Sequence, residues 1–335
     1  MSDPQNAIEF DACSIVFGKK PAHALRLADE GLERAAIEEA TGEVLGVHDA
    51  ALNVQDGEIV VLMGLSGSGK STLLRAVNGL NPVVRGDVRV RMGGRMVSVP
   101  HADAQQLRRL RLRHVSMVFQ QFGLLPWRSV AENVGLGLEL AGAAPEERRQ
   151  RVGAQLAMVG LTDWAERPVG ELSGGMQQRV GLARAFATEA PILLMDEPFS
   201  ALDPLIRTRL QDELLELQRS SRRTILFVSH DLDEAFKLGN RIALMEGGRI
   251  VQTGTAREIL ARPANGYVAD FVAHMNPLEV LTARDLAAPG MAEGQPLPAD
   301  LPLKEVLGAL RETEARPVTG GGIVTRDQVL QRLSA

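Results

Sequence analysis

The chain has 335 residues, of which 45% are hydrophobic, and its formal net charge at pH 7 is -5. This length allows one large domain and a smaller one, and the acidic balance argues against a nucleic-acid binder with a globally basic surface. The single cysteine, Cys13, excludes an intrachain disulfide and a multi-cysteine zinc site, as in proteins of a reducing compartment. We expect no secretory signal in the polar N-terminus and no membrane span, which requires roughly 18–20 apolar residues.

The sequence of the first half of the chain predicts a series of strands that is interrupted by one helical insertion. Ala7–Phe17 is interpreted as an edge strand that ends at Gly18, and 23–40 has the apolar spacing of a helix stopped by Thr41-Gly42. Further strands are expected over Val44–Val54, Glu58–Met63 and Val115–Phe119, a hairpin over Asp87–Val99, and helices over Lys70–Leu80 and Gln105–Arg113.

The second half begins with a helical region and then returns to a parallel-sheet pattern. Two fully apolar strands are expected, Ile192–Met195 and Thr224–Ser229, with the helix Pro204–Ser220 between them. The other elements expected are helices over Val130–Ala141, Pro145–Val159, Thr162–Glu166, Thr255–Leu260 and Tyr267–Val272, and a hairpin of Arg241–Met245 with Arg249–Gln252.

The clearest motif is a phosphate-binding loop, or P-loop, between a predicted strand and a predicted helix. The backbone N–H groups of such a loop hold phosphates at a helix N-terminus. We expect Lys70 to reach the β- and γ-phosphates of ATP and Ser71 to hold Mg²⁺. The residues assigned to nucleotide binding in this segment are Gly64, Leu65, Ser66, Gly67, Ser68, Gly69, Lys70, Ser71 and Thr72.

Two acidic residues follow the apolar run Ile192–Met195. Asp196 ends the strand, where an unpaired carboxylate is costly unless it meets a cation, so Mg²⁺ held through water is its expected partner. Glu197 comes next and is placed to orient or deprotonate an attacking water. A surface role for Glu197 is the alternative, and the apolar residues before Asp-Glu-Pro argue against it.

Polar residues also end two other strands. His230 follows Thr224–Ser229 and is predicted to contact the γ-phosphate, although a lone histidine is more often structural. Gln120 follows Val115–Phe119, and its spacing alone leaves open whether it is a ligand or a polar cap. The basic segment Arg108–His114 is interpreted as a solvated helix face, because no aromatic platform for bases lies beside it.

These motifs together resemble those of ATP-binding cassette (ABC) ATPases. The resemblance covers about residues 7–275 and implies an α/β fold of the P-loop NTPase class. The domain that the resemblance implies is an ABC nucleotide-binding domain with a RecA-like core, an antiparallel β-subdomain and a helical subdomain. We assign it to residues 1–275, with a helical insertion near 19–41. The segments that carry the resemblance are Gly64–Ser71, Gln120, Leu172–Gln178, Ile192–Glu197, Ser200–Asp203 and His230.

The resemblance also implies a head-to-tail homodimer with two ATP molecules between the copies. Ser173 and Gly175 of one copy then bind the γ-phosphate held by the other, and Asp203 links the two sites. Gln120 senses Mg²⁺ beside the groove where the coupling helix of a membrane subunit docks. The cofactor-binding set therefore adds Ser173, Gly174, Gly175, Gln177 and Asp203, the metal set is Ser71, Gln120 and Asp196, and the catalytic set is Glu197, His230 and Gln120.

Members of this family usually stack adenine on an aromatic residue shortly before a glycine. Phe17-Gly18 fits that pattern, although the insertion that follows leaves a core role for Phe17 open. The insertion and other segments resemble the ATPases of bacterial quaternary-amine importers. Those segments are Leu45–Val47, Val61–Ser66, Ser200–Arg207 and Ser229–Ala235.

Residues 276–335 are predicted to form a small C-terminal α+β tail. Importers for osmoprotection often carry two modules of the cystathionine-β-synthase type there, and this tail has room for one at most. Lys304–Arg311, Gly322–Val324 and Arg326–Leu333 resemble a degenerate helix–strand–helix remnant of such a module. The shorter form is more similar to the ATPase of the choline importer.

The resemblance therefore implies an ATPase subunit of a bacterial importer, with ATP and Mg²⁺ as cofactors. It would take up a quaternary amine, choline first and glycine betaine or proline betaine next. Its expected partners are a second copy of the chain, an integral membrane permease and, indirectly, a periplasmic binding protein, but no nucleic acid. We expect it at the cytoplasmic face of the inner membrane as a peripheral protein. The alternatives are an importer ATPase for another small solute and a non-transport ABC ATPase acting on nucleic acid.

Overall fold

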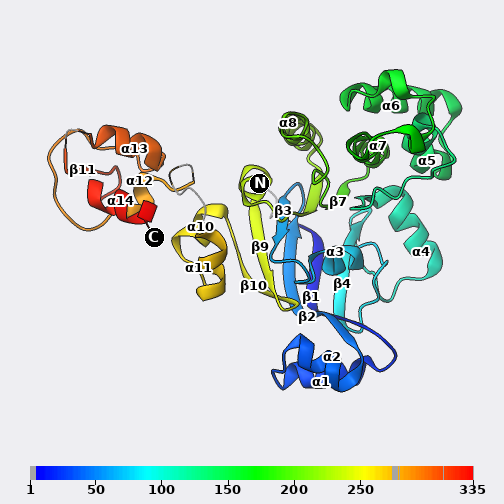
Figure 1. Ribbon diagram of the computed structural model, residues 1–335, viewed down its shortest axis with the longest axis horizontal. Helices are drawn as coiled ribbons and strands as arrows, with labels where there is room; N and C mark the ends of the chain where they lie inside the picture. The colour runs from blue at the N-terminus through cyan, green and yellow to red at the C-terminus, as the bar shows by residue number, and fades with distance from the viewer. Residues whose placement is uncertain (1–4, 274–277, 279, 312, 335) are drawn as a thin grey trace. The chain divides into compact units, whose positions relative to one another are not determined.

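A computed structural model describes residues 5–273, 278, 280–311 and 313–334 (Figure 1). The chain divides into two compact units. The first contains the residues up to His230 together with Met245–Ile250, and the second contains Asp231–Leu244 and the residues from Val251 onward. Within the described residues, no helix combines the length and the apolar character needed to cross a membrane. The boundary expected near residue 275 stays a prediction.

The first unit contains an antiparallel sheet in the order β2-β1-β4-β5. β1 pairs with β2 along its whole length and with β4 through Ile8–Asp11, so both of its edges are hydrogen-bonded. The expectation of an edge strand was therefore wrong, because the second partner lies far along the chain. The strands are β1 (Asn6–Phe17), β2 (Val44–Gln55), β4 (Arg85–Met92) and β5 (Arg95–Ser98).

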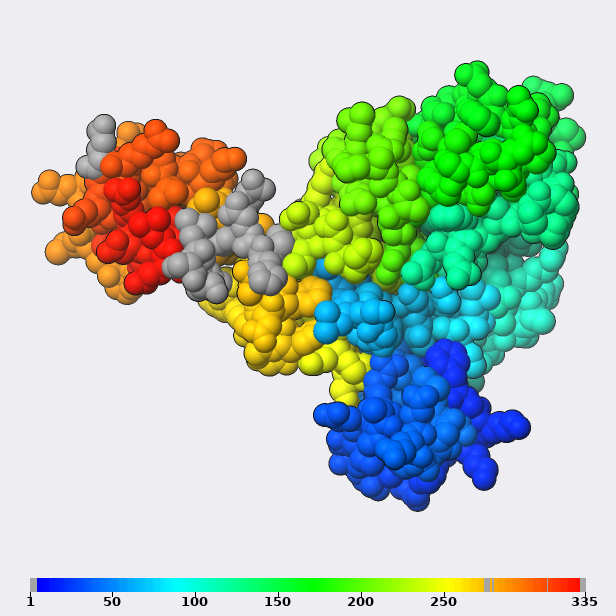
Figure 2. Space-filling model, in the orientation of Figure 1, coloured from blue at the N-terminus to red at the C-terminus, as the bar shows by residue number. Residues whose placement is uncertain are grey.

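The insertion between β1 and β2 forms two helices rather than the single helix expected. α1 (Pro21–Asp29) and α2 (Arg34–Thr41) are separated by a turn in which Gly31 has a φ of +90°, a conformation that favours glycine. Gly42 ends α2 in the left-handed conformation, as Thr41-Gly42 predicts. The two helices form the blue lobe in Figure 2. They share a small apolar core with β1 and β2, made of Val16, Ala24, Leu25, Ala28, Ile37 and Leu45.

Two polar anchors fix this insertion to the sheet. At its start, the buried carboxylate of Glu43 accepts hydrogen bonds from the backbone N–H groups of Lys19 and Lys20, at 3.1 and 2.9 Å. At the end of α1, Asp29 accepts two hydrogen bonds from Arg85, at 2.7 and 2.9 Å, and lies 2.8 Å from Nε2 of His48. Arg85 and then His48 hold the pKa of Asp29 well below its usual range, so this carboxylate is ionised at neutral pH.

The second sheet of this unit centres on four parallel strands in the spatial order β3-β8-β7-β6. Every residue of β3, β7 and β8 is buried, which explains their unbroken apolar sequences. The carboxyl ends of the parallel strands meet at one edge, where the functional residues follow them. The strands are β3 (Ile59–Met63), β8 (Thr224–Val228), β7 (Ile192–Asp196) and β6 (Val115–Val118).

Helices follow or connect these strands along the chain (Figure 1). α3 (Lys70–Ala76) follows the P-loop and ends four residues earlier than expected, and α8 (Pro204–Ser221) connects β7 to β8. α4 (Ala104–Arg109) is also shorter than expected, because the chain continues as a π turn over Leu110–His114. A helical region of α5 (Val130–Leu140), α6 (Pro145–Met158) and α7 (Gly174–Ala187) packs together, with short 3₁₀ turns at Thr162–Trp164 and Val169–Glu171.

The tail in the second unit buries apolar side chains, among them Leu303, Val306 and Val324. Two strands pair where the sequence indicated one, so the order is helix, strand, strand, helix. The expected boundary at residues 276 and 277 lies outside the described residues. The elements of this unit are α9 (Leu232–Leu238), α10 (Ala256–Ala261), α11 (Gly266–Val272), α12 (Ala283–Leu286), α13 (Leu303–Ala309), β11 (Ala315–Pro317), β12 (Ile323–Thr325) and α14 (Arg326–Ser334). The hairpin of β9 (Arg241–Glu246) and β10 (Arg249–Gly254) turns at Gly247-Gly248.

We predict that Gly18→Ala destabilises the first unit. Gly18 has a φ of +142°, and a Cβ there would lie 1.5 Å from Oε2 of Glu43, so the anchor at the start of the insertion must shift. The free energy of unfolding in urea should fall by about 1–3 kcal/mol. Gly153→Ala is the control, because a Cβ on this exposed residue of α6 meets nothing within 4 Å. Equal unfolding free energies for the two variants would refute the anchor.

Candidate functional site

A cavity of about 690 Å³ opens where the P-loop meets the carboxyl ends of the parallel strands. Most of the predicted nucleotide-binding and catalytic residues line it, and three residues that the sequence did not indicate line it as well. The predicted residues are Phe17, Ser66, Gly67, Gly69, Lys70, Ser71, Thr72, Gln120, Glu197 and His230, and the added ones are Arg34, Val44 and Gly46.

The P-loop is tightly fitted against its neighbours. Gly64 and Gly69 have φ values of +141° and +102°, and a Cβ on either would come within 2.1 Å of the Met245 carbonyl oxygen or 2.5 Å of that of Gly46. Only glycine fits both positions. The loop ends at Lys70, which begins α3, and three residues of the first helical turn, Lys70, Ser71 and Thr72, line the cavity. The free N–H groups of a helix N-terminus can bind an anion.

The ammonium group of Lys70 folds back onto the P-loop. Its Nζ donates hydrogen bonds to the backbone carbonyl oxygens of Gly64 and Leu65, at 2.8 and 2.9 Å. Burial lowers the pKa of Lys70, while the negative charges of Glu197 and Asp196 act in the opposite direction. A partly desolvated cation beside a helix N-terminus is a favourable place for an anion.

Asp196 is completely excluded from solvent at the end of β7. Its Oδ1 accepts a hydrogen bond from Oγ of Ser71 at 2.6 Å, and its Oδ2 forms an ion pair with Arg75 at 2.8 Å. The sequence indicated a metal ion as the partner of this carboxylate and did not indicate Arg75. The signal for Arg75 was its position four residues after Ser71, which places both on one face of α3.

The residues predicted to hold Mg²⁺ have suitable chemistry. Ser71, Gln120 and Asp196 offer a hydroxyl, an amide oxygen and a carboxylate, and Mg²⁺ prefers such oxygen ligands and keeps several waters. Ser71 and Gln120 line the cavity, and Asp196 lies directly behind Ser71. The donor set therefore fits the metal.

Glu197 lies at the centre of a three-residue cluster. Its Oε2 is 3.3 Å from Nε2 of Gln120 and 3.4 Å from Nδ1 of His230. These side chains follow β6, β7 and β8, so the parallel sheet brings together residues separated by 77 and 33 positions. Glu197 has a φ of +49°, a conformation that is rare outside glycine and that the surrounding contacts must maintain.

Gln178 supplies one of those contacts and was missed by the sequence reasoning. This buried residue of α7 donates from Nε2 to the carbonyl oxygen of Glu197 at 3.2 Å and accepts from the N–H of Ala201 at 3.0 Å. It therefore connects the glycine-rich signature helix to the backbone of Glu197. Its neighbour Gln177, which the sequence did indicate, donates to the Leu172 carbonyl oxygen instead. Ser200 also donates to the Glu197 carbonyl oxygen, at 3.1 Å.

Phe17 lies at the wall of the cavity rather than in the core. Its side chain is 39% exposed, and it pairs with Val44 across the β1–β2 ladder. A Cβ on Gly46 would come within 3.0 Å of Cε2 of Phe17 and 2.9 Å of Cγ2 of Thr72. The position is accessible to a flat ligand, and the stacking role stays a prediction.

The signature residues do not line this cavity. Ser173 is an exposed N-cap of α7, and its Oγ accepts from the N–H of Met176 at 3.4 Å. Asp203 caps α8 in the same way, through the N–H of Ile206 at 3.0 Å. The predicted residues that the structure places outside the cavity lining are Gly64, Leu65, Ser68, Ser173, Gly174, Gly175, Gln177, Asp196 and Asp203.

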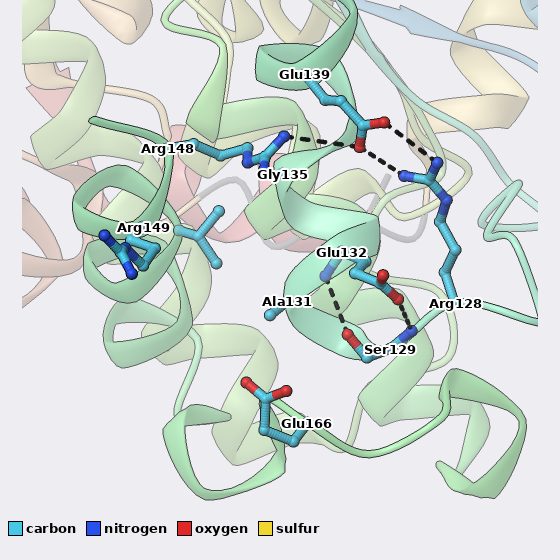
Figure 3. Close-up of a pocket in the computed structure, with 10 residues that line it drawn as sticks. Arg128, Ser129, Ala131, Glu132, Gly135, Glu139, Arg148, Arg149 and Glu166 are labelled. Carbon is cyan, nitrogen blue, oxygen red and sulfur yellow. Dashed lines mark hydrogen bonds and ion pairs between the residues drawn. The ribbon is translucent and has the colours of Figure 1, made fainter. Parts of the chain in front are cut away.

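A second cavity, of about 560 Å³, lies over α5 and α6 in the helical region (Figure 3). Glu139 is at its rim between Arg128, at 2.7 Å, and Arg148, at 3.8 Å. The hydrogen bond from Arg128 holds the pKa of Glu139 below its usual value, so the rim carries ionised groups of both signs. Trp127, which directly precedes Arg128, is 76% exposed.

Comparison with known proteins agrees with this geometry. Residues 47–200 match the family model described as ABC transporter. The chain is 50% identical over 272 residues to the glycine betaine/proline betaine transport system ATP-binding protein ProV of Salmonella typhimurium. The alignment covers 81% of this chain and 67% of ProV. It is also 42% identical over 292 residues to the trimethylamine N-oxide transport system ATP-binding protein TmoW of Ruegeria pomeroyi, in an alignment that covers 87% of this chain and 84% of TmoW. The chain belongs to the ABC transporter family.

This ABC chain also resembles solved structures of the family. The dimeric, post-hydrolysis structure of the ATP-binding cassette MJ0796 bound to ADP and Pi matches it with a TM-score of 0.64 at 29% identity, covering 75% of this chain and 99% of that one. The predicted ABC nucleotide-binding fold is thus confirmed, and ATP hydrolysis is supported. The chain spans about two thirds of the length of ProV.

We predict that Gln178→Leu lowers both stability and turnover. The apolar replacement leaves the Glu197 carbonyl oxygen and the Ala201 N–H without the amide, so unfolding in urea should become easier by about 1–3 kcal/mol. Because Glu197 loses part of its support, kcat for ATP should fall about tenfold. Gln105→Leu makes the same chemical change on an exposed turn of α4 and is the control. Wild-type kcat in Gln178→Leu would contradict the supporting role.

Proposed function

We propose that this ABC chain is the ATP-hydrolysing subunit of an importer for a quaternary amine. The observation that carries the proposal is the convergence of Gln120, Glu197 and His230 on the P-loop cavity, because these side chains surround the place where a γ-phosphate would end. The similarity to ProV, a protein of a glycine betaine/proline betaine transport system, favours these two solutes. Choline is the more specific prediction, because the short tail is more similar to that of the choline importer's ATPase.

In the proposed reaction the P-loop N–H groups and Lys70 bind the phosphate chain of ATP. Mg²⁺, when bound, would neutralise charge on the β- and γ-phosphates. Glu197 orients the attacking water and accepts its proton, and Gln120 keeps the carboxylate in place. His230, which lies beside Glu197, contacts the γ-phosphate. Phe17 receives the adenine ring. The residues that would hold the metal are Ser71 and Gln120, together with Asp196 acting through water.

Two copies of the chain are proposed to share each nucleotide. Ser173 and its neighbouring glycines lie outside the cavity of their own chain, so their exposed N-cap is available to a second copy. The solved structure of the related cassette MJ0796 is a dimer. In the proposed homodimer, Ser173, Gly174, Gly175 and Gln177 face the nucleotide of the other copy, and Asp203 lies between the two sites.

The helical region is proposed to receive an integral membrane permease. The cavity over α5 and α6 is a recessed surface lined by ionised groups of both signs (Figure 3), and the exposed Trp127 directly precedes its lining residue Arg128 in the chain. Buried aromatic anchors surrounded by polar groups are typical of protein interfaces. We infer a peripheral position at the cytoplasmic face of the inner membrane, with a periplasmic binding protein acting through the permease.

The basic segment before β6 uses one of its arginines in contacts within the chain, which leaves less charge for a nucleic-acid function. Its Arg111 donates to the backbone carbonyl oxygens of Asn78 and Gly79, at 2.9 and 3.1 Å, which are contacts inside the protein.

We predict that Glu197→Gln binds MgATP with wild-type affinity and loses at least about 100-fold in kcat, because the amide accepts no proton. The variant should also accumulate as a dimer when MgATP is added, measured by size-exclusion chromatography with light scattering. Glu216→Gln, on the exposed face of α8, is the control and should hydrolyse ATP normally. Hydrolysis by Glu197→Gln at the wild-type rate would remove Glu197 from the mechanism.

The transported solute is tested in a strain that lacks this chain. Uptake of labelled glycine betaine or proline betaine should be lost and should return with the wild-type chain but not with Lys70→Ala. Loss of choline uptake alone would select choline as the substrate. If the uptake of all three compounds is unchanged, the proposal of a quaternary amine is wrong.

A further inference from the structure

The insertion places a cation in the wall of the nucleotide cavity. Arg34 is the first residue of α2 and lines the cavity together with the P-loop residues Gly67 and Lys70. It comes from a segment outside the motifs that carry the resemblance to ABC ATPases. The residue is therefore a feature of the insertion.

The guanidinium of Arg34 is held by backbone carbonyl oxygens. Its Nε donates to Leu45 at 2.6 Å, NH2 donates to Gly46 at 3.3 Å, and NH1 donates to Gly67 of the P-loop. Within the described part of the chain, no carboxylate forms an ion pair with it. Burial lowers the pKa of Arg34, while the negative charge of Glu38 acts in the opposite direction. The group is a partly desolvated cation whose hydrogen-bond acceptors are neutral carbonyl groups.

This arrangement favours an anionic ligand. A guanidinium carries five N–H donors in a planar fork, and the carbonyl groups engage only part of them. A partly buried cation without a carboxylate partner gains more from an added anion than a solvated one does. Lys70 also lines this cavity, so the two cations share it.

The contacts of Arg34 also indicate which part of a nucleotide it meets. On one side it is bonded to Gly46, whose Cα lies next to the ring of Phe17, and on the other side it is bonded to Gly67 of the P-loop. Arg34 therefore lies between the place proposed for adenine and the place proposed for the β- and γ-phosphates. The group between those two parts of ATP is the ribose with the α-phosphate.

We propose that Arg34 is a nucleotide-contacting residue that pairs with the α-phosphate of the bound nucleotide. This inference rests on the proposed function, in which the cavity binds ATP. The insertion is built to hold the residue still, because Glu43 fixes its start and Asp29 pairs with Arg85. Its two helices thus position one side chain from outside the cassette motifs.

The test compares the affinities of Arg34→Gln and wild-type full chain for MgATP and MgADP, measured by titration calorimetry. Loss of a charge-assisted hydrogen bond should weaken both nucleotides by about tenfold and by the same factor, because both carry the α-phosphate. Arg34→Lys should recover part of the loss. Raising the salt concentration should shrink the difference from wild type, because ions screen the lost charge.

Arg26→Gln is the matched control, since it removes the same charge from an exposed position on α1. Unchanged affinities in Arg34→Gln, an equal loss in Arg26→Gln, a loss for MgATP alone, or a loss independent of salt would each overturn the inference. Lys70→Ala separates it from the proposed function. If Lys70→Ala loses nucleotide while Arg34→Gln does not, only the inference fails, and if wild type binds neither nucleotide, both fail.

Discussion

The site depends on the buried carboxylate of Asp196. It lies at the end of a strand with no solvent contact, and hydrogen bonds from Ser71 and Arg75 satisfy both of its oxygens. These contacts join the helix that follows the P-loop to the strand that precedes Glu197. Because an unpaired buried carboxylate is costly, the spacing between the phosphate loop and the acidic residues is fixed before any nucleotide arrives. The fold therefore supplies a prearranged cavity, which is the condition for orienting a reacting water.

Glu197 shows how the same constraint continues into the catalytic cluster. Its left-handed backbone is maintained by hydrogen bonds from Gln178 and Ser200 to its carbonyl oxygen. Gln178 belongs to the helix that begins at the signature residue Ser173, so a movement of that helix reaches the backbone of Glu197 directly. In the proposed dimer, the docking of Ser173 on a second nucleotide and the position of Glu197 are thus mechanically linked.

The insertion between β1 and β2 adds a further layer to the cassette. It has its own apolar core and two polar anchors, and the guanidinium of Arg34 donates a hydrogen bond to the phosphate loop. A segment of this kind changes the electrostatics of the cavity without altering the P-loop itself. The proposed contact with the α-phosphate would make the insertion part of nucleotide binding.

The sequence by itself determined the P-loop, the apolar parallel strands and the residues that follow them. These features depend on neighbouring residues: glycines at positive φ, a helix start, and a strand whose end places a polar side chain at the sheet edge. The tertiary structure alone decided that β1 lies inside its sheet, that the insertion forms two helices, and that Arg34 and Gln178 reach the site. Each of these depends on partners far apart along the chain, such as Gly67 for Arg34 and Glu197 for Gln178. Packing brings such partners together, and no local pattern specifies which distant carbonyl group a side chain will meet.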